Sequence, residues 1–207
     1  MKHAALLQPI NDYFRARLRE HGPTARGADW NSPEAQRLRF AQLLRLCDTS
    51  QPFALLDYGC GYGALAGFLM EQGVSCRYTG YDICSDMIRQ ARSLFAACAH
   101  CQFYDDDALL EPADYCVASG IFNIRLAAGL EEWQEHVLQT LDRMNRLGAR
   151  GFAYNLLTRY ADPERMRGDL YYADPCFYFD HCKTRYSQQV ALLHDYGAFD
   201  FTILVRK

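Results

Sequence analysis

Three glycines at alternate positions follow an acidic residue early in the chain. Asp57 precedes Gly59, Gly61 and Gly63 in the run LLDYGCGYG, which continues an apolar segment that starts at Phe53. Glycine permits sharp turns and lets a ligand approach the backbone where a Cβ would obstruct it. The free N–H groups at the start of a helix favour an anionic group. The segment therefore predicts a strand that opens through a glycine turn into a helix, with a ligand site at the turn.

Further carboxylates follow the next two strand-like segments. Asp82 ends the segment 76–82, and three consecutive aspartates end or follow the segment 101–105: Asp105, Asp106 and Asp107. An ionised carboxylate is suited to accept the two hydrogen bonds of a sugar diol. Asp82 has an alternative role as a cap for the helix that begins near Ser85. The three aspartates have the alternative of a solvated turn.

The elements that must position these residues alternate from residue 53 onward. Strands are predicted at 53–58, 76–82, 101–105, 114–119 and 150–156, and helices at 63–72, 85–97 and 130–147. Such alternation predicts a parallel sheet wound by right-handed crossovers. Near the end, 189–196 and 199–206 flank Gly197-Ala198 and are therefore expected to pair antiparallel. The predicted fold class is α/β, a doubly wound and mostly parallel seven-stranded sheet with an antiparallel C-terminal strand.

Two helices are expected before this core. Residues 3–20 have apolar positions at helical spacing, and Ser32 with Pro33 is typical of a helix start, for a helix that runs to about Leu46. The length suits a single domain over 1–207. We divide it into an N-terminal helical appendage, 1–50, and a Rossmann-like core, 51–207. Within the core the long aromatic segment 156–186 is a candidate substrate cover.

The D-x-G-x-G-x-G pattern resembles the first motif of the class I S-adenosylmethionine-dependent methyltransferases, and the resemblance extends from about Phe53 to the C-terminus. It implies a Rossmann-like fold and S-adenosyl-L-methionine as cofactor. It also implies that Gly59, Cys60 and Gly61 hold the methionine moiety and that Asp57 helps to place its ammonium group. Asp82 matches the ribose-binding acid of the family.

The same resemblance assigns further cofactor contacts. Ile83 takes the position that packs on adenine, and Asp105 is favoured as acceptor for the adenine amino group, with Asp106 contributing its backbone N–H. Ser119 and Gly120 follow the fourth strand and would lie beside the methionine part. Arg39 could meet the cofactor carboxylate, or it could be an ordinary surface arginine.

Methyl transfer needs alignment of a nucleophile with the methyl carbon rather than a catalytic triad. No residue is singled out as catalytic, and the candidates for orienting an acceptor are Asn123, Asn155, Tyr171 and Tyr172. With a net charge of −3 and a pI near 6.1, the chain lacks the overall positive electrostatic potential that would attract nucleic acid. The segment after the fourth strand lacks the N/D-P-P-Y/F/W motif of amino-directed enzymes. A small-molecule acceptor remains by elimination.

Two alternatives stay open at this stage. A nicotinamide-dependent oxidoreductase would have the spacing G-x-G-x-x-G, one residue longer than the spacing present here. A regulatory protein that binds S-adenosylmethionine without transferring its methyl group would keep the same motif.

Cysteine usage and hydropathy indicate the compartment. Nine cysteines, an odd number, are scattered through apolar segments, which suits reduced thiols in the cytoplasm. Residues 1–15 lack the apolar run of a secretory signal, and no segment has 18 consecutive apolar residues, so no membrane partner is expected. Cys98 and Cys101 lack a second such pair, so no metal is expected either. The sequence leaves the oligomeric state open.

Overall fold

The computed structural model of the chain describes residues 2–207, with side chains from Ala5 onward. Its strands are β1 (Phe53–Tyr58), β2 (Cys76–Tyr81), β3 (Cys101–Tyr104), β4 (Ala113–Ala118), β5 (Gly148–Thr158), β6 (Tyr172–Ala173), β7 (Gln189–Leu193) and β8 (Asp200–Arg206). They form one sheet in the order β3-β2-β1-β4-β5-β8-β7, with the two-residue β6 beside β5. All pairings are parallel except those of β8 with β5 and β7. The predicted fold class is confirmed.

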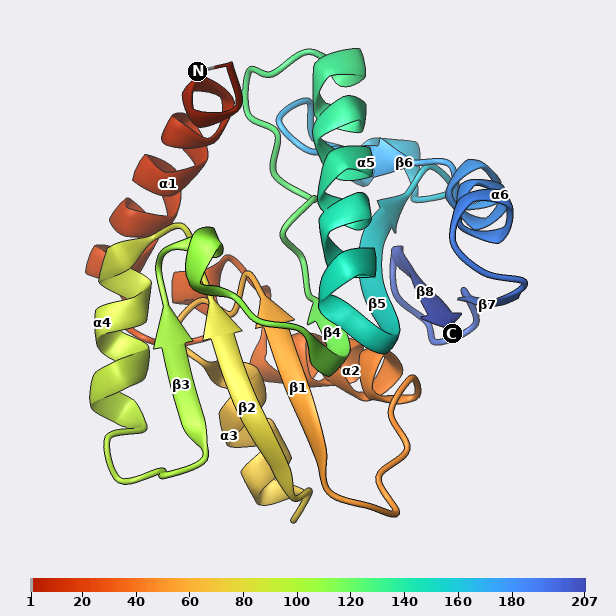
Figure 1. Cartoon of the computed structure of the whole chain (residues 1–207). Helices are drawn as coiled ribbons and strands as arrows, with labels where there is room; N and C mark the ends of the chain where they lie inside the picture. The colour runs from red at the N-terminus through yellow and green to blue at the C-terminus, as the bar shows by residue number, and fades with distance from the viewer. Residues whose placement is uncertain (1) are drawn as a thin grey trace.

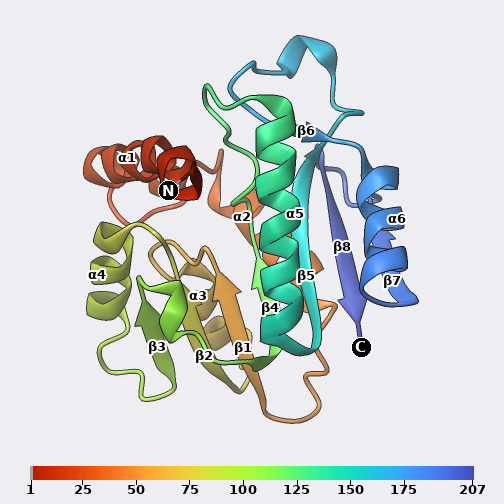
Figure 2. The same ribbon diagram turned by 45° about the horizontal axis from the view of Figure 1, so that its top comes forward.

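Helices cover both faces of this sheet (Figures 1 and 2). They are α1 (Lys2–His21), α2 (Pro33–Leu44), α3 (Ala64–Glu71), α4 (Ser85–Leu94), α5 (Leu130–Leu147) and α6 (Pro175–Arg185). Apolar residues of α5 and α6 pack in one core cluster, and those of α2, α3 and α4 pack in another. Within residues 2–207, no helix is both long enough and apolar enough to cross a membrane.

The sheet lies between the two clusters because successive strand residues point to opposite faces. In β1, Phe53 and Leu55 belong to the cluster with α2, α3 and α4, whereas Ala54 and Leu56 belong to the cluster with α5 and α6. A strand buried on both faces reads as a continuous apolar run, as the sequence of β1 does. The carboxyl ends of β1 and β2 consequently emerge at one edge of a rigid core.

Element ends differ from the prediction where local backbone chemistry intervenes. Helix α3 begins at Ala64 because Gly63, with a φ of +85°, is not helical. Strand β7 ends at Leu193 rather than at residue 196, since the chain from His194 to Asp195 is exposed and leaves the sheet. The Ser32 cap is confirmed, because its Oγ accepts a hydrogen bond from the Ala35 N–H at 3.1 Å.

A buried ion pair attaches the N-terminal helices to the far end of the sheet. The Arg39 guanidinium on α2 donates to the Asp200 carboxylate at the start of β8, with side chains that are 12% and 0% exposed. Burial raises the pKa of Asp200, and the charge of Arg39 opposes that rise. The Arg39 guanidinium also lies 4.8 Å from the ring centroid of Trp30. This contact fixes the segment before α2 against the core.

We expect Asp200→Ala to lower the free energy of unfolding by about 3 kcal/mol, because it leaves the Arg39 charge largely buried without its counterion. Urea denaturation at pH 7 measures this change. The exposed neighbour Asp195 provides the control, and Asp195→Ala should change stability by less than about 0.5 kcal/mol. Equal stability of the two variants would show that the pair does not hold α2 to β8.

Candidate functional site

The glycine turn between β1 and α3 is held by the end of β2. The N–H groups of Gly59 and Cys60 both donate to the Tyr81 carbonyl, at 2.7 and 2.8 Å. The φ angles at Gly59, Gly61 and Gly63 are +86°, +55° and +85°, a region that disfavours residues with a Cβ. The three glycines are therefore required by the backbone conformation itself.

Two of these glycines have different surroundings. A Cβ at Gly59 would stand 2.1 Å from the Ile121 side chain, so this glycine allows close packing. A Cβ at Gly61 would meet no atom within 4 Å. Gly61 thus exposes its backbone to open space at the centre of the turn, as a ligand cradle would.

Asp82 links this turn to the next one. Its Oδ2 accepts from the Gly61 N–H at 2.9 Å, and its Oδ1 accepts from the Cys84 N–H at 2.8 Å. Burial raises the pKa of Asp82, and the two backbone hydrogen bonds oppose the rise. A carboxylate has about four lone-pair positions, so two remain for a ligand. Holding the α4 start and binding a diol are therefore compatible.

Asp57 is a buried carboxyl group at the end of β1. It is 2% exposed, and its Oδ2 accepts from the Tyr78 hydroxyl at 2.6 Å. Burial raises the pKa of Asp57 to about 7, the Tyr78 hydrogen bond lowers it, and the nearby Asp82 charge raises it further. A cationic ligand group would supply the positive countercharge that the ionised carboxylate lacks.

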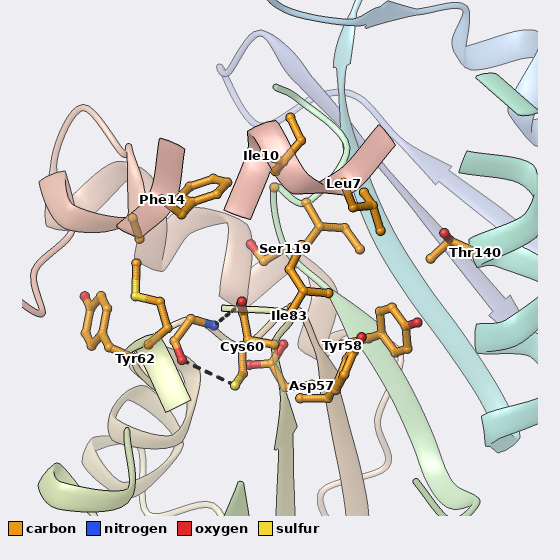
Figure 3. A pocket seen from close by; sticks show the side chains of 18 of the residues that line it. Leu7, Ile10, Phe14, Asp57, Tyr58, Cys60, Tyr62, Ile83, Ser119 and Thr140 are labelled. Atoms are coloured by element: carbon orange, nitrogen blue, oxygen red, sulfur yellow. Dashed lines mark hydrogen bonds between the residues drawn. The ribbon is translucent and has the colours of Figure 1, made fainter. Parts of the chain in front are cut away.

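These groups line a cavity of about 250 Å³ beyond the carboxyl ends of β1 and β2. Leu7, Ile10 and Phe14 of α1 lie across from the glycine turn, and Figure 3 shows them opposite Asp57 and Cys60. Such a site is typical of open α/β sheets, which bind ligands at this edge. The apolar face of α1 therefore serves as one wall of the cavity.

Most residues assigned to the cofactor from sequence meet at this cavity. Eight of them line it: Asp57, Gly59, Cys60, Gly61, Asp82, Ile83, Ser119 and Gly120. Trp30, Gln36 and Phe40 from the N-terminal region line it as well. The placement agrees with the assignments, and their roles toward a cofactor stay predictions.

The structure does not bring Asp105 and Asp106 to the cavity. Both side chains are exposed. The Asp105 Oδ1 lies 3.5 Å from the Arg92 Nη2, and the Asp106 Oδ1 accepts from the Ala108 N–H at 2.9 Å. Of the three consecutive aspartates, Asp107 is the one that lines the cavity. Strand β3 ends at Tyr104, and Asp107 begins the short 3-10 helix Asp107–Leu109, where its Oδ1 accepts from the Arg143 Nε at 3.1 Å.

Arg39 also lies outside this cavity. Its guanidinium is bound to Asp200, and the expectation of a direct contact with a cofactor carboxylate here is not supported by its position. Sequence spacing gave no sign of this partner, because 161 positions separate the two residues.

The four candidates for orienting an acceptor differ in position. Asn155 is fully buried, and its Oδ1 accepts from the Gly120 N–H at 2.7 Å, so it holds the loop after β4. The Asn123 Oδ1 accepts from the Leu157 N–H at 3.3 Å. The Tyr171 hydroxyl is buried 3.0 Å from the Tyr178 hydroxyl and lines neither cavity described here. The Tyr172 hydroxyl accepts from the Arg167 N–H at 3.1 Å.

A second cavity of about 280 Å³ adjoins the first. The two share four lining residues, Phe14, Ala28, Trp30 and Gly120. Asn123 belongs to its lining, and the segment 156–186 contributes Leu157, Ala161, Arg165, Arg167, Leu170 and Tyr172. The role of that segment as a substrate cover stays a prediction.

Other lining residues were not identified from sequence. Leu7, Ile10 and Phe14 were visible only as an apolar helix face, without a sign of what that face covers. His136 and Thr140 reach the first cavity from α5, where the ring of His136 lies 4.9 Å from that of Trp133. No group of three or more His, Cys, Asp or Glu side chains able to hold a metal ion occurs among the described residues.

The raised pKa of Asp57 predicts a pH-dependent cost of folding. Between pH 4 and 7 the folded state holds a proton that the unfolded state has released, so the contribution of this group to stability is lost as pH rises toward 7. Asp57→Asn keeps an acceptor for Tyr78 without the charge. Relative to the wild type, we expect the free energy of unfolding of this variant to rise by about 2 kcal/mol as the pH increases from 5 to 8, measured by urea denaturation.

The exposed Asp180 on α6 serves as the control, through Asp180→Asn. A wild-type pH profile that Asp57→Asn leaves unchanged would contradict the assignment of a titrating carboxyl at this position.

The comparisons with known proteins bear on this site. A family model described as a methyltransferase domain matches residues 55–151. A curated protein of Mycobacterium tuberculosis, named "Putative methyltransferase Rv1506c", is 50% identical over 164 residues, which make up 79% of this chain and 99% of that protein.

Solved structures show the same fold at low sequence identity. The crystal structure of human N-acetylserotonin methyltransferase in complex with SAM has a TM-score of 0.64 and 18% identity, covering 98% of this chain and 59% of that one. The N-methyltransferase NodS from Bradyrhizobium japonicum, in complex with S-adenosyl-L-homocysteine, has a TM-score of 0.61 and 17% identity, covering 94% and 97%. The extent of the curated match and the shared fold show that the chain belongs to the methyltransferase family and has the fold of its S-adenosylmethionine-dependent members.

Proposed function

We propose that the first cavity binds S-adenosyl-L-methionine and that the chain transfers its methyl group to a small-molecule acceptor. The observation that carries this proposal is the open backbone at Gly61 in a cavity that the carboxylates of Asp57 and Asp82 also line. Two solved structures with the same fold were obtained with this cofactor or its demethylated product, which supports the same assignment.

The cavity offers a partner for each part of the cofactor. Asp57 supplies a buried negative charge for the ammonium group, and the free lone pairs of Asp82 suit the ribose hydroxyls. Ile83 and Met87 provide apolar contact for the adenine ring. Asp107 replaces Asp105 as the proposed acceptor for the adenine amino group, because it is the aspartate of that turn that faces the cavity.

The bound cofactor supplies an electrophilic methyl group on a sulfonium. Transfer forms a bond between the acceptor atom and the methyl carbon, and the electron pair of the broken carbon–sulfur bond stays on sulfur. The chain aligns the two reactants and keeps water out. Leu7, Ile10 and Phe14 of α1 are placed to exclude water from the cavity, and Asn155 holds the loop at Gly120 in position.

The alternatives are weighed by the same observations. Family membership favours methyl transfer over nicotinamide chemistry. A protein that binds the cofactor without turnover would have the same cavity, so activity must be measured. The nine free thiols favour a reducing compartment such as the cytoplasm as the site of action.

Cofactor binding is tested by calorimetry with S-adenosyl-L-homocysteine. We expect Gly61→Val to weaken binding at least 100-fold, because its side chain would enter the cradle. Gly73→Val is the matched control, since Gly73 also has a positive φ of +65° with no atom within 4 Å of its Cβ position, but lies outside the cavity. Equal loss in both variants, or no loss in either, would remove the site from this turn.

Turnover is tested by supplying S-adenosyl-L-methionine together with each acceptor of a small-molecule panel and measuring the release of S-adenosyl-L-homocysteine. Release with at least one acceptor, absent in Gly61→Val, is the expected result. Tight binding with no release across the panel would replace the proposal with the non-catalytic alternative.

A further inference from the structure

The second cavity has a cationic lining beside the proposed cofactor site. Three arginines line it, Arg39, Arg165 and Arg167, together with one carboxylate, Asp29. Asp29 is already 3.2 Å from Arg17, which offsets its charge. Each arginine has a carboxylate neighbour, Asp200, Asp162 or Asp169, but these three aspartates do not line the cavity. Guanidinium groups therefore outnumber carboxylates among the groups that line it.

Two of these arginines retain hydrogen-bond donors. Arg167 donates from Nε and Nη2 to Asp169 and also interacts with the Tyr13 hydroxyl, which together use only part of its five N–H donors. The Arg165 Nε lies 3.6 Å from the Asp162 Oδ2, which is beyond hydrogen-bond distance, and 72% of the Arg165 side chain is exposed. Arg39 contributes positive charge rather than a free donor, since its Nη1 and Nη2 donate to the Ala35 carbonyl and the Asp200 carboxylate and its Nε is buried. Such donors are the usual partners of a carboxylate.

Aromatic and apolar side chains form the rest of the lining. Trp30 stands at the wall shared with the first cavity, and the Phe199 ring lies 5.6 Å from the Arg165 guanidinium. Ile124 and Leu170 add apolar surface. A small ligand with a planar or apolar part would pack against this wall, and its charged group would lie toward the arginines.

We infer that this second cavity holds the methyl acceptor and that it selects a small molecule with a carboxylate group, an inference that rests on the proposed function. A cationic acceptor would be repelled by the arginines and by the neighbouring sulfonium, whereas a carboxylate is attracted by both. The cavities meet at Trp30 and Gly120, so an acceptor anchored at Arg165 and Arg167 would direct its other end toward the methyl donor.

Trp30 reports on this cavity without any need for turnover. The chain has two tryptophans. Trp133 is fully buried, and its Nε1–H donates to the Phe122 carbonyl at 2.8 Å, so its indole N–H signal is an internal reference. The protein is labelled with ¹⁵N-tryptophan, saturated with S-adenosyl-L-homocysteine, and titrated with matched acids and amides, beginning with benzoate and benzamide. Trp30→Phe assigns the two signals.

We expect the acids to shift the Trp30 signal with at least tenfold lower Kd than their amides, while the Trp133 signal stays in place. The double variant Arg165→Ala/Arg167→Ala should abolish this preference, and both side chains are exposed enough for the fold to survive. Arg146→Ala, an exposed arginine on α5 outside both cavities, should retain it.

Other results overturn the inference in distinguishable ways. Equal affinity for acids and amides, or no shift of Trp30 by any acid while S-adenosyl-L-homocysteine binds, would refute the carboxylate selection and leave the proposed function intact. Failure of the wild type to bind S-adenosyl-L-homocysteine in calorimetry would refute the proposed function, and the inference with it.

Discussion

The carboxylate of Asp82 holds together the two turns from which the site is built. It binds one backbone N–H from the glycine turn after β1 and one from the turn after β2. Without it, Gly61 and Cys84 would each keep an unpaired donor at the edge of the cavity, at a cost of about 1–3 kcal/mol for each group that stays buried. The same carboxylate keeps lone pairs for a ligand. Structural support and the proposed ligand binding therefore depend on a single side chain, and its pKa reflects both burial and these contacts.

The N-terminal helices and the segment between them contribute residues to the walls of both cavities. Trp30 packs against Gly120, where a Cβ would come within 2.6 Å of the indole ring. Arg39 lies over the same ring and is anchored by the buried Asp200. Trp30 thus forms a fixed wall between the two cavities. A methyltransferase must keep donor and acceptor in line over a short distance, and a rigid shared wall is one way to achieve it.

Much of this organisation could be predicted from local sequence. Strand β1 was recognised to the residue because both its faces are buried, and Gly61 because its position after an acidic strand end is distinctive. Interactions between distant segments could not be predicted. The partner of Arg39 lies 161 positions away, and the choice of Asp107 over Asp105 depends on a three-residue helical turn with no strong sequence signal. Tyr171, a candidate from its type alone, proved to pair with Tyr178 in the core.

We propose that the cavity beside the glycine turn accommodates a sulfonium nucleoside. The decisive measurement is a crystal structure of the chain grown with S-adenosyl-L-homocysteine. We expect density for the amino-acid end beside Asp57 and Gly61 and for the ribose at Asp82, under the apolar face of α1. Well-ordered ligand at another position, with this cavity filled by water alone, would contradict it.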